Sequence, residues 1–388
     1  MQRVALTGII FFSALSTLLY LLSVTYLTNF QSSETKIHPY QHIIDQIQWI
    51  TEFADNKTEF KAENPPRIYY DRKFLYHLTQ PEGCRYKCIF TDELQFLGRG
   101  DAAVFSDSYS PEQISKIKER GVIIVFESGE SPVHMPILSQ KQLRLTDMFN
   151  THLAKSMVPY LYPMFWKSTH PKTGFTKEEK LAIETANSSK LLPVYHKSRR
   201  NSIAWVVSNL HPHNNRAEFA RLISYFIHVD IYGGRNKSFP EGGDLFEYVS
   251  RRNKFYLAFE NSNCRNYITE KVTFNALQHD MIPIVLGAYK EDYEAVLPPH
   301  SYINVDDFKT IRELTDYIKY LDRNDTAYAK YFTWKEYGKI IDPIRMDCRL
   351  CGFMYHLRSG KIKISQPNPK DFVDPESLCF YRPLLPIE

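Results

Sequence analysis

Short apolar runs alternate with amphipathic stretches along most of this chain, in two separate series. The strands expected in the first series cover 68–70, 88–90, 102–105 and 122–126. Those of the second series cover 203–207, 229–232, 255–259, 282–286 and 302–305, with helices expected near 214–226, 243–251, 268–279 and 309–321. Short buried strands that alternate with helices predict parallel sheets, so we expect an α/β fold of the doubly wound type.

A polar, lysine-rich stretch over 168–201 separates the two series. This organisation predicts two Rossmann-like domains that face each other across a cleft, one over 67–197 and one over 198–345, followed by a cysteine-containing segment over 346–388. The chain has no G-x-G-x-x-G fingerprint, so nothing in it supports a dinucleotide-dependent dehydrogenase.

The amino-terminal region predicts a membrane anchor. After Arg3 no charged residue occurs before Glu34, and the run over 4–27 is strongly apolar. At about 1.5 Å per residue, this run is long enough to cross a hydrocarbon core about 30 Å thick. A cleaved signal peptide is the alternative, but its apolar part usually covers about 7–15 residues, and this run is longer. We therefore expect a cytoplasmic tail over 1–3, an uncleaved signal-anchor over 4–27 and a polar stem over 28–66.

Two further features indicate that the remainder of the chain is lumenal. N-glycosylation sequons begin at Asn56, Asn187, Asn236 and Asn324. The chain also has six cysteines, and disulfides form in the secretory pathway. The disulfide candidates come from two close pairs, Cys84, Cys88, Cys348 and Cys351. Their pairing stays open, because each pair can bond internally or bonds can cross between the two ends. Half of a zinc site is the alternative for the second pair, but no second C-x-x-C occurs at zinc spacing.

Composition restricts the partners. Hydrophobic residues make up 43% and charged residues 24% of the chain, which is the balance of a globular protein with a core. The formal net charge is only +4 and no long basic tract occurs, so we expect no binding of nucleic acid. Aromatic residues reach 14%, which suits contacts with carbohydrate without proving them.

The stretch over 254–287 carries the most chemistry. A strand expected over 255–259 runs into a polar loop over 260–266, and a helix is expected to begin at Thr269, a favourable N-cap. Ligands of open parallel sheets sit at such junctions. The helix dipole favours Glu270 in the first turn but disfavours Lys271, unless that lysine meets an anion such as a diphosphate. The alternative for Lys271 is a solvated surface lysine.

The same stretch resembles a known family. The run FENSNCRNYITEKVTFNAL, followed by IPIVLG, closely resembles the signature of the α1,3/4-fucosyltransferases of glycosyltransferase family 10, in the form of an invertebrate-like member. Further matches extend the resemblance across most of the expected lumenal part. They lie at 205–209 and 229–233 for the donor domain of the family, and at 101–105 and 127–134 for its acceptor domain. The C-terminal cysteine pair is also of the family type.

The resemblance implies a GT-B fold in a single-pass type II Golgi membrane protein. It implies inverting transfer of L-fucose from GDP-β-L-fucose to a GlcNAc-containing glycan in α1,3 linkage. By the same resemblance, Lys271 and Arg216 bind the pyrophosphate and Glu270 holds the ribose hydroxyls. The pocket for nucleotide and fucose is then lined by Tyr267, Asn261, Tyr256, Ser208 and Asn209. For Arg216, the alternative is an arginine on a helix surface.

Inversion also requires a general base on the acceptor side. The E-S-P element of the family aligns best with Glu130-Ser131-Pro132, which makes Glu130 the predicted base. Glu127 is the second candidate, because the Glu-Ser step occurs twice here. For either residue the alternative is a loop carboxylate that caps a neighbouring helix. A metal-held donor usually needs a D-x-D motif, and none occurs. We therefore expect no metal site and no required cofactor, with Mn²⁺ at most a stimulating ion.

Two departures from the family pattern concern function. Asn266 stands where the family usually has an acidic residue, and we expect this change to tune activity more than abolish it. The stretch over 149–160 is shorter than in many relatives, so the acceptor side is divergent and Tyr160 is only a tentative match to a pocket residue. A catalytically inactive membrane protein that binds a nucleotide sugar or a glycan is the alternative function. The predicted base and pyrophosphate ligands favour the enzyme.

Overall fold

The computed structural model describes residues 41–71, 82–107, 109–169, 174–186, 189–199, 201–209, 212–233, 243–341 and 345–388. The predicted cytoplasmic tail over 1–3, the signal-anchor over 4–27 and the start of the stem lie outside these ranges. Within the described residues, no helix combines the length and the apolar character that a membrane crossing requires.

The first half of the fold is a parallel sheet. Among the described residues it has five strands in the order β2-β1-β3-β4-β5, all parallel. The strands are β1 (Arg67–Tyr70), β2 (Ile89–Thr91), β3 (Ala102–Phe105), β4 (Ile123–Ser128) and β5 (Met148–Thr151). Successive side chains of a strand point to opposite faces. Val104 accordingly packs with α13 (Met346–Arg358), and Phe105 packs on the other face with α4 (Pro111–Glu119).

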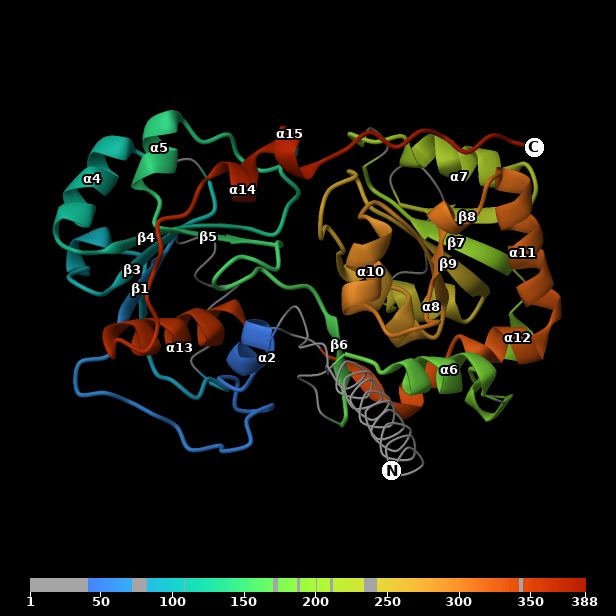
Figure 1. Ribbon diagram of the computed structural model, residues 1–388, viewed down its shortest axis with the longest axis horizontal. Helices are drawn as coiled ribbons and strands as arrows, with labels where there is room; N and C mark the ends of the chain where they lie inside the picture. The colour runs from blue at the N-terminus through green and yellow to red at the C-terminus, as the bar shows by residue number, and fades with distance from the viewer. Residues whose placement is uncertain are drawn as a thin grey trace, which may run out of the picture.

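The second half repeats this architecture. Its described strands are also parallel, in the order β11-β10-β9-β7-β8. They are β7 (Asn201–Val206), β8 (Val229–Tyr232), β9 (Asn253–Phe259), β10 (Ile282–Leu286) and β11 (Ile303–Asn304). Every residue of β9 is buried, as expected for a central strand that has both faces covered. The α/β class with parallel sheets, predicted from the sequence, is confirmed (Figure 1).

Helices cover both faces of this second sheet. One face packs against α7 (Arg216–Ser224), α11 (Ile311–Arg323) and α12 (Asp325–Lys330). The other face packs against α8 (Leu245–Ser250), α9 (Glu270–Thr273) and α10 (Lys290–Val296). The helix predicted over 268–279 is shorter than expected, because α9 ends at Thr273 and a separate 3₁₀ turn covers Leu277–His279.

Two regions differ from the predicted boundaries. The described part of the predicted stem is not a free spacer, because α2 (Gln41–Ile47) buries Ile43 and Ile47 against Ile341. The lysine-rich stretch that was expected to be a linker contains α6 (Lys177–Thr185), which contacts α12 of the second half. In addition, β6 (Met164–Lys167) pairs antiparallel with β12 (Gly338–Ile341), a sheet that the apolar pattern did not predict.

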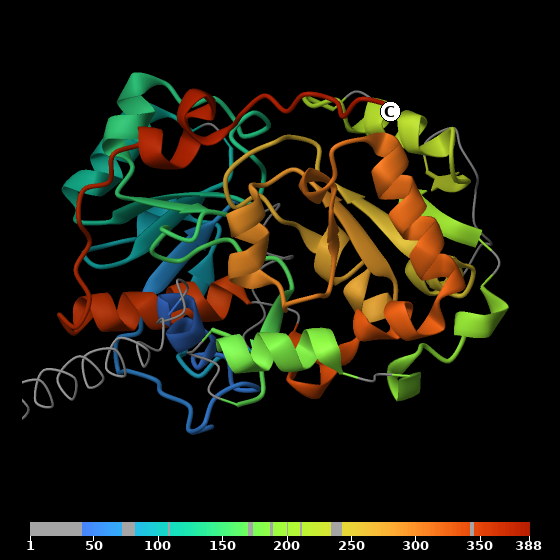
Figure 2. The same cartoon turned by 45° about the vertical axis from the view of Figure 1, so that its right-hand side comes forward.

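The C-terminal segment joins the two halves. Helix α13 packs on the first sheet, and the chain then runs through α14 (Lys370–Val373) and α15 (Pro375–Leu378) toward the second sheet. Figure 1 and Figure 2 both show this red segment crossing from one half to the other. At its end, Ile311 N donates a hydrogen bond of 2.9 Å to Pro386 O, at the start of α11.

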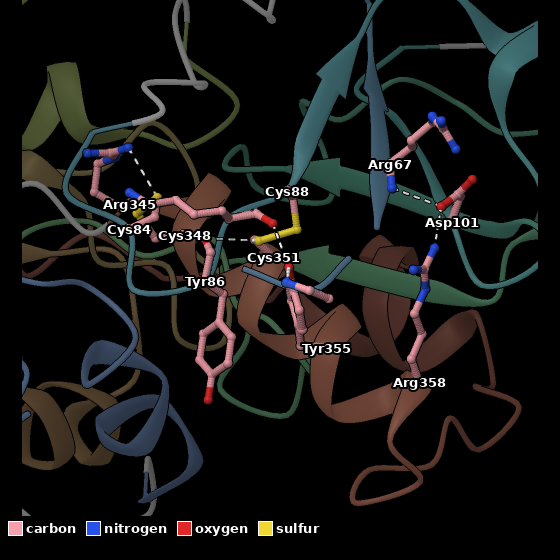
Figure 3. Close-up of a disulfide and its surroundings, with 12 residues drawn as sticks. Arg67, Cys84, Tyr86, Cys88, Asp101, Arg345, Cys348, Cys351, Tyr355 and Arg358 are labelled. Carbon is pink, nitrogen blue, oxygen red and sulfur yellow. Dashed lines mark hydrogen bonds and ion pairs between the residues drawn. A yellow bond between two sulfur atoms is a disulfide. The ribbon is translucent and has the colours of Figure 1, made fainter. Parts of the chain in front are cut away.

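Three disulfides close the fold. Cys84 bonds Cys348 and Cys88 bonds Cys351, so the bonds cross between the two ends of the chain (Figure 3). Because these sulfurs bond one another, they are not zinc ligands. The third disulfide joins the remaining pair, Cys264–Cys379, and it ties the C-terminal segment to the loop that follows β9.

The crossed pairing yields the first prediction. Digestion of the unreduced protein should release one linked species that contains the peptides around Cys84 and Cys88 together with the peptide around Cys348 and Cys351. Mass spectrometry of that species before and after reduction checks the pairing. A peptide in which Cys348 is bonded to Cys351 would contradict it. The double variant Cys88→Ser/Cys351→Ser should lose about 2–5 kcal/mol of unfolding free energy.

Candidate active site

Residues at the carboxyl ends of the two sheets meet between the halves. Glu130 follows β4, and its Oε2 accepts a hydrogen bond of 3.0 Å from the hydroxyl of Tyr267, which follows β9. Nearby, Ser262 Oγ donates to Ser131 Oγ over 2.6 Å. The structure therefore brings the predicted base and a predicted donor-pocket residue into direct contact.

The Glu130 backbone is held by aromatic neighbours. The hydroxyl of Tyr162 donates to Gly129 O over 2.8 Å, and the ring of Tyr160 lies close against Gly129. A Cβ atom at Gly129 would lie 2.5 Å from Tyr160 Cε1, so only glycine fits there. Tyr160, which the resemblance matched to a pocket residue, thus supports the loop that carries the glutamate. His152 adds a second support, because its Nδ1 lies 3.1 Å from Glu130 O and burial lowers its pKa to about 4.

The second candidate base, Glu127, lies in a different environment. It is only 1% exposed, and the hydroxyl of Tyr70 lies 3.5 Å from its Oε2. Burial raises the pKa of Glu127 to about 7, while the nearby charge of Arg349 acts in the opposite direction. Arg349 is itself fully buried on α13. Glu127 is therefore a core carboxyl, whereas Glu130 is exposed to solvent.

Lys271 is surrounded by acidic and polar side chains. Its Nζ lies 3.0 Å from Glu260 Oε2, 3.3 Å from Glu270 Oε1 and 2.8 Å from Thr269 Oγ1. Burial alone would lower the pKa of Lys271, but the two carboxylates outweigh it and the pKa lies above its ordinary value. The side chain is only 20% exposed, so the interpretation of Lys271 as a solvated surface lysine is wrong.

Glu260 is the central carboxylate of this group of side chains. It is fully buried, and its Oε1 accepts hydrogen bonds from Thr269 N at 2.8 Å and Thr269 Oγ1 at 2.9 Å. Thr269 is the N-cap of α9 as predicted, yet its side chain bonds Glu260 and makes no cap hydrogen bond. Gly287, at the end of the IPIVLG run, has φ +148° and would place a Cβ 2.7 Å from Glu260 Cβ. Glycine there makes room for the buried carboxylate.

Arg216 provides a second cation beside Glu260. It begins α7, is 4% exposed, and donates from Nη1 to Phe259 O at 2.8 Å and from Nη2 to Asn209 O at 2.9 Å. Burial lowers its pKa, and the charge of Glu260 opposes this shift. The alternative of a helix-surface arginine is therefore wrong. The buried Nε of Arg216 has no hydrogen-bond partner in the described part of the chain.

The other predicted pocket residues are spread more widely. Ser208 and Asn209 lie exposed in the loop after β7. Asn261 is half-buried, and its Oδ1 accepts a hydrogen bond of 3.1 Å from Ser262 Oγ. Tyr256 is fully buried, with its hydroxyl 3.3 Å from Asn275 Nδ2. We call Lys271 and Arg216 together the cation cluster. Of the four pocket residues above, Asn209 contacts this cluster directly, because its backbone oxygen accepts a hydrogen bond from Arg216.

Comparison with known proteins identifies the family. Residues 196–366 match the model described as glycosyltransferase family 10 (fucosyltransferase) C-term. Glycoprotein 3-alpha-L-fucosyltransferase A of Drosophila melanogaster is 32% identical over 272 residues, which are 69% of this chain and 51% of that protein. Residues 196–366 form a domain of glycosyltransferase family 10. The 4-galactosyl-N-acetylglucosaminide 3-alpha-L-fucosyltransferase FUT6 of Homo sapiens is 40% identical over 144 residues, 37% of this chain and 40% of that protein. The chain thus spans about half the length of these relatives, or less.

Solved structures show the same fold. A crystal structure of an alpha1,3-fucosyltransferase with GDP-fucose matches with a TM-score of 0.53 at 19% identity, over 85% of this chain and 100% of that one. Another, with GDP, matches with a TM-score of 0.52 at 19% identity, over 86% of this chain and 99% of that one. At these identities the likeness concerns the fold alone.

The family 10 domain contains the cation cluster, while Glu130 precedes it in the sequence. Within this domain, the departure at Asn266 has a local physical reason. Asn266 has φ 56°, a conformation that asparagine tolerates better than most residues. Its Nδ2 and backbone N donate to the two carboxylate oxygens of Asp292, each over 2.9 Å. An acidic side chain at this position would repel Asp292, so the amide fits its partner.

Two of the four predicted N-glycosylation sites lie in described parts of the chain. Asn56 is exposed. Asn324 is the N-cap of α12, where its Oδ1 accepts a hydrogen bond of 3.0 Å from Ala327 N and its Nδ2 donates to Tyr320 at 3.2 Å. Asn187 and Asn236 lie outside the described residues. Asn56 therefore presents its amide more openly than Asn324 does, and glycosylation of all four stays a prediction.

The buried Glu127 predicts a pH dependence of stability. Its folded pKa of about 7 exceeds the ordinary value of 4.5, so its contribution to stability is complete below pH 4.5 and is lost as the pH rises toward 7. Glu127→Gln should remove this slope, which amounts to at most about 1.4 kcal/mol per pH unit. Urea denaturation at pH 5 and pH 7 measures it. Equal pH dependence in variant and wild type would show that Glu127 does not titrate in this range.

Proposed function

We propose that this protein is an inverting α1,3-fucosyltransferase, which transfers L-fucose from GDP-β-L-fucose to a GlcNAc-containing glycan. One observation carries the proposal. An exposed carboxylate, Glu130, and two largely buried cations, Lys271 and Arg216, lie in the same region, where the carboxyl ends of the two sheets meet. The names of the relatives support fucose transfer as the activity. No feature of the described residues favours the inactive alternative.

The donor half of the mechanism rests on the cation cluster. When the bond between fucose C1 and the phosphate oxygen breaks, the electron pair leaves with GDP and negative charge grows on the diphosphate. Lys271 offers a compact charge and Arg216 a planar fork for phosphate oxygens. Lys271 is held by Glu260, and Arg216 is held by the backbone oxygens of Phe259 and Asn209, so little reorganisation is needed as the charge develops. Glu270, 43% exposed beside Lys271, is placed to meet the ribose hydroxyls.

The acceptor half rests on Glu130. The acceptor hydroxyl attacks C1 from the face opposite GDP, and its proton passes to the Glu130 carboxylate as the new C–O bond forms. This attack inverts the β configuration of the donor to α in the product. The Tyr267 hydroxyl fixes one carboxylate oxygen and leaves the other for the acceptor. Glu127 is unsuited to this role, because it is buried in the core.

The proposal extends to architecture and place in the cell. Two parallel sheets whose carboxyl ends meet support a GT-B arrangement, with the acceptor domain over 67–197 and the donor domain over 198–345. The apolar run over 4–27 supports a type II signal-anchor in the Golgi membrane, with the catalytic part in the lumen. Because the sequence lacks D-x-D and two cations already face the diphosphate, we propose that no metal is required and that Mn²⁺ at most stimulates.

Removal of Lys271 tests the donor half. Lys271→Ala should lower the rate of fucose transfer by about 10²–10³, since one charged donor to a leaving group contributes roughly 2–4 kcal/mol. The assay uses labelled GDP-fucose in the presence of EDTA, with Lys319→Ala on α11 as a control that should stay active. The double variant Lys271→Met/Glu260→Gln removes both buried charges, so it should melt like the wild type and still be inactive. A near-normal rate in Lys271→Ala would remove this lysine from the site.

Substitution of Glu130 tests the acceptor half. Glu130→Gln keeps the volume and can still bond Tyr267, but it cannot accept a proton. Transfer should fall by about 10²–10⁴ with little change in the affinity for GDP-fucose, measured by kinetics and by donor titration. Glu127→Gln is the matched control and should slow transfer much less. If Glu127→Gln is the slower variant, the base is misassigned by one Glu-Ser step.

A further inference from the structure

A groove runs beneath the C-terminal segment, next to the meeting of the two sheets. We call it the tail groove; it has a volume of about 530 Å³ and is lined by Val133, the turn at 213–215, Asn263, Pro375, Glu376 and the stretch at 379–382. We propose that the tail groove binds the sugar residues of the acceptor glycan that lie beyond the one that receives fucose. This inference rests on the proposed function and adds a subsite to it.

The tail groove has rigid walls. Cys379 is bonded to Cys264, and Phe380 N donates to Asn263 O over 2.9 Å. The ring of Phe380 stacks on Tyr289, with the ring centres 4.0 Å apart. Next to it, Arg382 donates from Nη1 to Asp306 at 2.7 Å and from Nη2 to Ala288 O at 2.9 Å. Side chains presented from this wall are therefore held in place before a ligand arrives, which reduces the entropy lost on binding.

The lining chemistry fits a neutral, polar ligand. Three carboxamides line the groove, at Asn214, Asn215 and Asn263. Asn214 Nδ2 donates to Glu260 O and to Asn263 Oδ1, each over 3.0 Å, and Asn215 Nδ2 donates to Arg382 O over 3.2 Å, so internal hydrogen bonds hold these polar side chains in the wall of the groove. Tyr381 adds an aromatic ring that is 85% exposed. The guanidinium in the lining, Arg382, is already paired with Asp306, and no lysine lines the groove among the described residues. A phosphate would therefore find no available cation, whereas a sugar finds amides and an exposed ring.

The tail groove also lies within reach of the proposed base. Val133 of the lining is three residues after Glu130, and a fully extended chain advances at most about 3.6 Å per residue, so their Cα atoms are no more than about 11 Å apart. Ser131, between them, contacts Ser262, the neighbour of Asn263 in the groove. A glycan with its reactive hydroxyl at Glu130 can thus place its next sugar residues along the groove.

The substitution Tyr381→Ala tests this subsite. Because the ring is exposed and is not part of a hydrophobic core, its removal should not lower the stability of the fold. For an extended, N-glycan-derived oligosaccharide acceptor, KM should rise roughly tenfold, the loss expected for one aromatic platform. For a minimal GlcNAc-containing disaccharide, KM should not change, and neither should kcat or the KM for GDP-fucose. Tyr381→Trp keeps a ring and should restore the low KM. Tyr225→Ala, which removes a 62% exposed tyrosine elsewhere on the second half, should leave both acceptors unaffected.

If Tyr381→Ala and the wild type have the same KM for the extended acceptor, the subsite is overturned. The subsite is also overturned if the KM of Tyr381→Ala rises equally for both acceptors and its melting temperature falls. If the wild-type protein transfers fucose to no acceptor, the proposed function fails but the groove is still testable. Saturation-transfer NMR with the free extended oligosaccharide should then show binding to the wild type that Tyr381→Ala loses. Binding that is absent from the wild type, or the same in both proteins, would contradict the subsite.

Discussion

The ion pair between Glu260 and Lys271 holds the donor half of the site together. An isolated buried carboxylate is costly in free energy, and burial indeed raises the pKa of Glu260. Lys271 and the two hydrogen bonds from Thr269 offset this cost. The result is that the start of α9, the end of β9 and the glycine after β10 are fixed relative to one another. The two pieces of the family signature, FENSNCRNYITEK and IPIVLG, therefore pack together around Glu260 as one structural unit.

Covalent bonds fix the halves in a similar way. The two crossed disulfides tie α13 to the segment between β1 and β2, although the bonded cysteines are more than 260 residues apart in the chain. The third disulfide ties the last residues to the loop between Glu260 and Tyr267. The Tyr267 hydroxyl then reaches across to Glu130. The relative placement of the base and the cation cluster thus depends on contacts between segments that are distant in sequence.

This distance explains what the sequence could and could not predict. Strands with continuous apolar runs, such as β9 and β10, were predicted because burial on both faces leaves a local signal. The strand β5 (Met148–Thr151) was missed because it is short and mixes apolar with polar residues. The pair of β6 with β12 was missed because the two strands are also mixed and lie far apart in the chain. The roles proposed for Lys271 and Arg216 came from resemblance, whereas Glu260, which pairs with Lys271, gave no signal by itself. The match of Asn266 to Asp292 also needed the structure.

In the proposed mechanism, Glu130 and the cation cluster act on opposite faces of one fucosyl group. The most direct test is the configuration of the product. The part of the chain from residue 41 onward is incubated with GDP-β-L-fucose and a GlcNAc-containing oligosaccharide, and the linkage is determined by NMR from the coupling of the fucose anomeric proton. The account predicts an α-linked fucose. A β-linked product would contradict it, because it would mean that the acceptor attacks from the face that GDP leaves.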